Sequence, residues 1–103
     1  DEWRIVYLAE TDKATPLNLT QHTYFNLSAE NDSTILNHVL TIHSDEITAV
    51  DADLTPTGKM RPVAGTEMDF TKPKRIGEEI RKVREGGGYD HNYVLRGRSG
   101  EMK

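Results

Sequence analysis

Residues 16–27 constrain the fold of this chain most, because their side chains alternate with the two-residue period of a β-strand. One face would be apolar, and the other would carry uncharged hydrogen-bonding groups around a central histidine. The apolar positions are Leu17, Leu19, Phe25 and Leu27, and the polar positions are Asn18, Thr20, His22, Tyr24 and Asn26. This pattern fits a strand that is solvated on its polar side. It fits equally a strand that offers neutral donors and acceptors to sugar hydroxyls, with His22 able to exchange a proton near neutral pH.

The remaining segments predict a mainly β chain with one short surface helix. The helix is expected over residues 74–85, because Ile76, Ile80 and Val83 recur on one side at i, i+4 and i+7. The glycines at 86–88 should end it. The other expected elements are strands at residues 4–9, 35–44, 47–50 and 89–95 and a turn at residues 54–58.

Composition narrows the class of partner. A chain of 103 residues can bury one core, and its net charge of −4 argues against nucleic acid or an anionic membrane as partner. No apolar run approaches the length of a membrane span. The absence of cysteine rules out a disulfide frame and favours a reducing compartment, so we expect a cytoplasmic protein.

Four blocks resemble, in order, segments of the aldose 1-epimerases, also called galactose mutarotases. They are residues 15–27 (TPLNLTQHTYFNL), 50–58 (VDADLTPTG), 62–70 (PVAGTEMDF) and 88–95 (GYDHNYVL). The resemblance runs from about residue 4 to residue 95. It implies that the chain is the middle portion of one large antiparallel β-sandwich, incomplete at both ends. It also implies an isomerase that interconverts the α and β anomers of galactose or glucose and needs no metal or other cofactor.

The same resemblance assigns roles to two residues. His22 matches the histidine that acts as the acid and protonates the ring oxygen of the sugar. Many members have asparagine where this chain has Gln21, a neighbour expected on the opposite face. Asp90 matches the sugar-binding aspartate, whose carboxylate can accept hydrogen bonds from two adjacent hydroxyls. Without the resemblance, Asp90 would be interpreted as a turn residue, and His91 is expected to face away from it and to be structural.

Other residues that the family uses have no match here. Members carry an arginine and a second histidine upstream of the His22 block, and a glutamate, the general base, downstream of the Asp90 block. Glu101 lacks the pattern that surrounds that glutamate. We therefore expect the 103 residues alone to be inactive or nearly so, because both proton transfers are needed.

Three other hypotheses arise from the sequence. His38 and His43 could be a metal pair, but five residues apart on a strand they would face opposite ways, so no metal site is expected. A non-catalytic carbohydrate-binding β-sandwich would keep the sugar site and lack the chemistry. A hexose-phosphate mutarotase would need arginines for the phosphate, and Arg96 and Arg98 are the nearest candidates.

Overall fold

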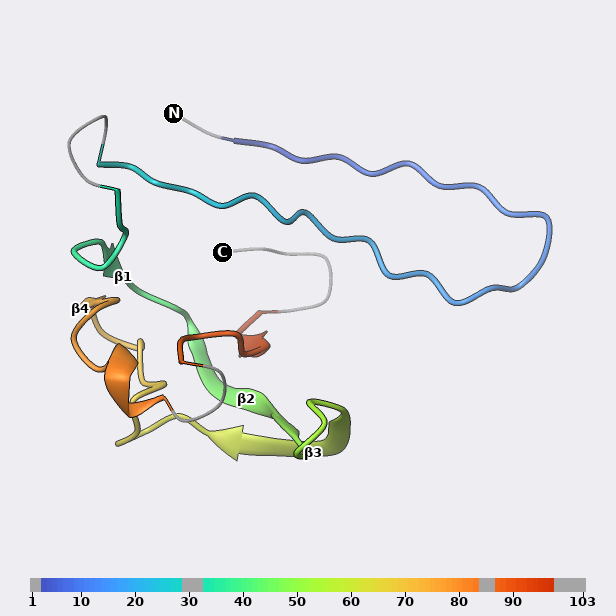
Figure 1. Ribbon diagram of the computed structural model, residues 1–103. Coiled ribbons are helices and arrows are strands. Elements are labelled where there is room, and N and C mark those ends of the chain that lie inside the picture. The colour runs from blue at the N-terminus through green and yellow to red at the C-terminus, as the bar shows by residue number, and fades with distance from the viewer. Residues whose placement is uncertain (1–2, 29–32, 84–86, 98–103) are drawn as a thin grey trace.

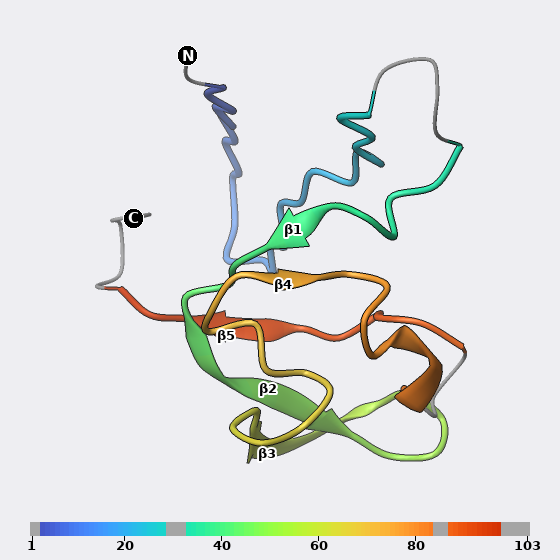
Figure 2. The same cartoon turned by 90° about the vertical axis from the view of Figure 1, so that its left-hand side faces the viewer.

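The computed structural model describes residues 3–28, 33–83 and 87–97, and its strands form two antiparallel sheets. A two-stranded sheet pairs β1 (Val39–Leu40) with β4 (Lys74–Arg75). A three-stranded sheet has the order β3 (Pro56–Pro62), β2 (Ser44–Val50), β5 (Tyr93–Leu95). Figure 2 shows the β1–β4 pair above the three-stranded sheet. The predicted all-β class is confirmed, and the described residues contain no helix that could cross a membrane.

Residues 3–28 form an arm without assigned strands, so the strands expected at residues 4–9 and 16–27 are absent. Figure 1 shows two extended limbs joined by a turn and set apart from the sheets. Trp3 and Phe25 pack edge to face with ring centroids 4.8 Å apart, and the Leu27 N–H donates to His38 Nε2 at 2.8 Å. The backbone is extended as the alternation predicts. A ladder also needs a partner strand, and no described residue pairs with the arm in this way.

The helix predicted over residues 74–85 is wrong in its extent. Lys74–Arg75 forms β4, turns follow, and only Ile80–Lys82 is helical, as the 3₁₀ turn η2. Residues 84 and 85 lie outside the described residues. The apolar side was correctly identified, because Val83 is buried and Ile76 and Ile80 line an apolar cavity. A turn with a short 3₁₀ segment can therefore direct these three side chains inward without an α-helix.

The other strand predictions are confirmed in part. The strand at residues 47–50 belongs to β2, whereas the expected strands at 35–44 and 89–95 shrink to β1 and β5. The predicted turn ends earlier than expected, because Pro56 already pairs with Val50 and opens β3. Strand β3 is entirely exposed and lies at a sheet edge, where proline is tolerated.

The core lies between the three-stranded sheet and the segment that follows β3. Ile47, Val63, Met68 and Val83 form one buried cluster, and Tyr89 and Tyr93 pack against it. Phe70 is buried as well. The buried Ser44 hydroxyl lies 2.6 Å from the Val94 carbonyl and 2.7 Å from the Glu46 carbonyl, so it ties β2 to β5.

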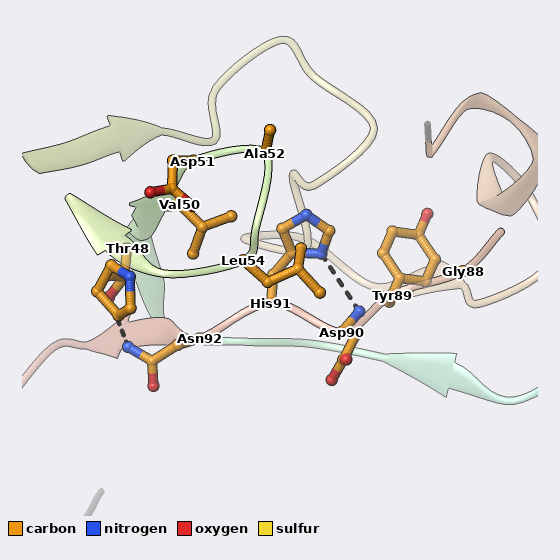
Figure 3. Close-up of a pocket in the computed structure, with 11 residues that line it drawn as sticks. Thr48, Val50, Asp51, Ala52, Leu54, Gly88, Tyr89, Asp90, His91 and Asn92 are labelled. Atoms are coloured by element: carbon orange, nitrogen blue, oxygen red, sulfur yellow. Dashed lines mark hydrogen bonds between the residues drawn. The ribbon is translucent and has the colours of Figure 1, made fainter. Parts of the chain in front are cut away.

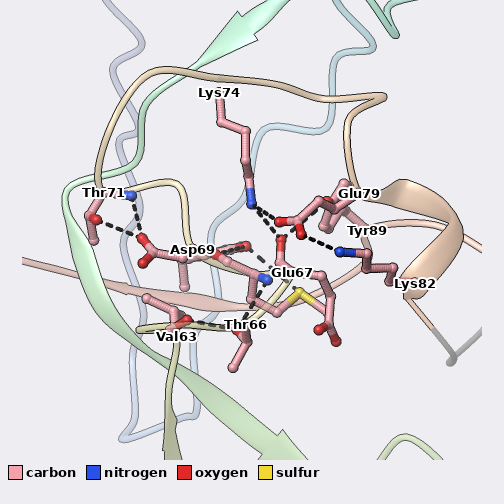
Figure 4. A network of polar contacts seen from close by, with 11 residues as sticks. Val63, Thr66, Glu67, Asp69, Thr71, Lys74, Glu79, Lys82 and Tyr89 are labelled. Atoms are coloured by element: carbon pink, nitrogen blue, oxygen red, sulfur yellow. Dashed lines mark hydrogen bonds and ion pairs between the residues drawn. The ribbon is translucent and has the colours of Figure 1, made fainter.

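A network around Lys74 joins the loop after β3 to η2 (Figure 4). The Lys74 ammonium donates to the Glu67 carbonyl at 2.9 Å and to Glu79 at 2.8 Å, and it lies 4.5 Å from the centroid of the Phe70 ring. Lys82 donates to the other Glu79 oxygen at 2.8 Å. These two ammonium donors lower the pKa of Glu79 to about 2.

Replacing Glu79 by glutamine should lower the free energy of unfolding by about 1–2 kcal/mol at pH 7. Because folding depresses the pKa, the carboxylate stabilises the fold above its unfolded value of 4.5 and loses that effect as pH falls towards about 2. Urea unfolding at pH 7 and at lower pH should show the deficit shrinking on acidification. Glu78→Gln, at an exposed neighbouring position, is the control. An equal deficit at all pH values would contradict the ionic cause.

Candidate functional site

A cavity of about 730 Å³ lies where the β2–β3 hairpin meets the segment leading into β5 (Figure 3). One wall comes from the hairpin, between Thr48 and Pro56. The other is the segment from Gly88 to Asn92. The cavity therefore combines parts of two of the four sequence blocks described above.

The segment at residues 88–92 is held at both ends. At one end the Asn92 side-chain amide donates to the Thr48 hydroxyl at 2.7 Å, and the Thr48 N–H donates to the Asn92 carbonyl at 2.9 Å. At the other end the Tyr89 hydroxyl donates to the Glu67 carbonyl at 3.2 Å, and the Tyr89 ring packs edge to face on Phe70. Asp90 lies between these two anchors.

Two tyrosines, one within this segment and one directly after it, act as protonated donors. Burial raises the pKa of Tyr93 to about 12 and also raises the pKa of Tyr89. The Tyr93 hydroxyl donates to the Met68 carbonyl at 2.9 Å. Since both phenols stay neutral near pH 7, these hydrogen bonds persist under physiological conditions.

The structure places Asp90 in the cavity lining, and the residue is exposed. His91 lines the same cavity, and its Nδ1 accepts from the Asp90 N–H at 3.3 Å. Residues 88–92 precede β5 and are not in a strand, yet Figure 3 shows the Asp90 carboxylate and the His91 ring pointing to different sides of this segment, as expected from the sequence.

His22 does not line this cavity. It is exposed on the arm, where its ring centroid lies 5.3 Å from that of Tyr24. The described structure therefore does not bring His22 and Asp90 into one site, and their roles remain predictions.

Thr48, Leu54 and Asn92 are cavity residues that the sequence did not single out. Asn92 lies within the block around Asp90, and its amide could have suggested a bracing role. Asp51 is exposed and closes a turn: its carboxylate accepts from the N–H groups of Asp53 and Thr55, both at 3.0 Å.

The remaining candidates have structural partners. His38 accepts from Leu27, and the described part of the chain contains no group of three or more potential metal ligands. Arg96 forms a bidentate ion pair with Asp45: the Nε and one terminal nitrogen of Arg96 each donate to a carboxylate oxygen of Asp45. Arg98 lies outside the described residues.

Comparison with known proteins identifies the family. The family model described as aldose 1-epimerase matches residues 1–103. The chain belongs to the aldose 1-epimerase family. The human galactose mutarotase is 42% identical over 91 residues, covering 88% of this chain and 26% of the relative. The aldose 1-epimerase of Escherichia coli K12 is 40% identical over 105 residues, covering 96% of this chain and 29% of the relative.

The chain thus spans less than a third of the length of either relative. Within that span it contains the block around His22 and the block around Asp90, of which the second forms a cavity wall.

Proposed function

We propose that the polypeptide carrying this chain is an aldose 1-epimerase that interconverts the α and β anomers of galactose or glucose. The match of all 103 residues to the family model carries this proposal. The cavity supports it, because its lining includes the carboxylate residue Asp90 and the neutral polar residues Asn92 and Thr48. Such groups suit the hydroxyls of a monosaccharide.

The reaction is a pair of proton transfers around ring opening. A base takes the proton from the anomeric hydroxyl, the bond between C1 and the ring oxygen breaks, and C1 becomes an aldehyde carbon. In the proposed mechanism His22 gives its proton to the ring oxygen, and Asp90 accepts hydrogen bonds from sugar hydroxyls. Rotation about the C1–C2 bond and reversal of the steps give the other anomer. No residue of this chain matches the family's general base.

Polarimetry of freshly dissolved α-galactose tests the activity and the missing base together. The whole polypeptide should accelerate mutarotation far above the buffer rate. The 103-residue chain alone should give a rate indistinguishable from buffer, because loss of one proton-transfer partner costs about 10²–10⁴-fold. A whole polypeptide that leaves the rate unchanged would overturn the assignment. Rapid equilibration by the isolated chain would show that it contains its own base.

One observation favours a second candidate, a carbohydrate-binding β-sandwich without catalysis. The cavity beside Asp90 forms while His22 remains outside it, and this candidate assigns no role to His22. This candidate predicts that the whole polypeptide binds galactose, detected by NMR titration, and leaves the mutarotation rate at the buffer value.

A further inference from the structure

The turn at residues 51–55 is a rigid wall of the cavity. Two of its hydrogen bonds come from the Asp51 carboxylate, as described above. Two more join backbone groups: the Asp51 N–H donates to the Thr55 carbonyl at 3.0 Å, and the Leu54 N–H donates to the Asp51 carbonyl at 3.1 Å. The turn therefore has a defined shape before any ligand enters.

Leu54 occupies an unfavourable position in this turn. Its φ is +61°, a left-handed conformation in which glycine or asparagine is usual and leucine is rare. It is the only residue other than glycine with a positive φ among the described residues. The side chain is 62% exposed, so burial within the chain does not offset this strain. Strain of this kind is often found where a residue serves binding or catalysis.

The cavity has two chemically different walls (Figure 3). Leu54, together with Val50, Ala52 and Pro56, makes the hairpin wall largely apolar. Asp90 and Asn92 make the other wall polar. A pyranose has the same division, because its hydroxyls project from the rim of the ring and its C–H groups lie on the two faces.

We propose that Leu54 is a specificity-determining residue, whose side chain packs on a C–H face of the pyranose while Asp90 accepts from its hydroxyls. The proposal rests on the proposed function, since it assumes that this cavity receives the sugar. It also predicts a preference. In galactose the axial 4-hydroxyl leaves the hydrogens on C3, C4 and C5 on one face, which gives a larger apolar patch than in glucose. Leu54 should therefore contribute more to galactose binding than to glucose binding.

The test measures the dissociation constants of galactose and glucose by NMR titration of the whole polypeptide, for the wild type, Leu54→Gly and Leu54→Ala. The glycine variant removes the side chain and the cost of the positive φ together, so it should fold at least as well as the wild type. The matched control is Leu95→Ala in β5, because Leu95 is 60% exposed and lies outside the cavity lining.

Both Leu54 variants should weaken galactose binding about 10-fold or more and glucose binding less, while Leu95→Ala stays within about 2-fold. In mutarotation kinetics, the weaker galactose binding of the Leu54 variants should raise KM and leave kcat little changed, because Leu54 takes no part in proton transfer. Unchanged galactose affinity in Leu54→Gly would overturn the proposal. Galactose binding that depends on Leu54 without mutarotation would overturn the catalytic function and retain this inference. A wild type that binds neither sugar would overturn both.

Discussion

Replacement of His22 by glutamine should lower kcat for galactose mutarotation by the whole polypeptide about 10²–10⁴-fold. Glutamine keeps a polar side chain of similar length but cannot deliver a proton to the ring oxygen. KM should change little, because the loss falls on the transition state. His22 is exposed on the arm and outside the cavity in the described structure, so this result also requires that the arm bring its imidazole to the sugar.

The matched control is His43→Gln, since His43 is also exposed and has no proposed role in the reaction. It should leave kcat within about 2-fold of the wild type. A His22→Gln variant that keeps wild-type kcat would show that another group protonates the ring oxygen.

Replacement of Met68 by alanine should destabilise the 103-residue chain by about 2–5 kcal/mol. Met68 is 1% exposed within the buried cluster, so truncation leaves a cavity that its packed neighbours cannot fill. A small sheet domain has a stability of the same order, about 5 kcal/mol. We therefore expect the variant to lose the dispersed amide NMR spectrum of a folded chain at temperatures where the wild type keeps it.

The same substitution at Met60 is the control for side-chain chemistry and helix or strand propensity. Met60 lies in the exposed edge strand β3 and is 51% exposed, so Met60→Ala should change stability by less than about 0.5 kcal/mol. Equal losses in the two variants would show that the burial of Met68 does not decide its contribution.

The local sequence pattern predicted a strand correctly where the described residues also include a strand that pairs with it. Residues 47–50 were expected as a strand and pair with β3 on one side and β5 on the other. Strand β3 was not expected, because it begins and ends with proline and its first residues were predicted as part of a turn that includes Gly58. Its pairing with β2 overrides this poor strand propensity, as is usual for β-structure at a sheet edge.

The two kinds of wrong secondary-structure prediction, the strands of the arm and the helix at residues 74–85, have different physical causes. The arm at residues 3–28 has strand-like alternation without strands, because hydrogen-bonded ladders depend on a second segment as well as on propensity. The predicted helix failed because the spacing of Ile76, Ile80 and Val83 reports which side chains face the core. It does not report whether α-helical or 3₁₀ and turn hydrogen bonds carry them there.

The sequence by itself determined the all-β class, the aldose 1-epimerase family and Asp90 as a candidate sugar ligand, because these depend on residue types in ordered blocks. Only the tertiary structure decided which side chains share the cavity. Asn92 and Thr48 are 44 residues apart, and their hydrogen bond sets the segment of Asp90 opposite the strained turn of Leu54. Such a juxtaposition follows from strand pairing and register, which bring together residues whose local patterns are independent of each other.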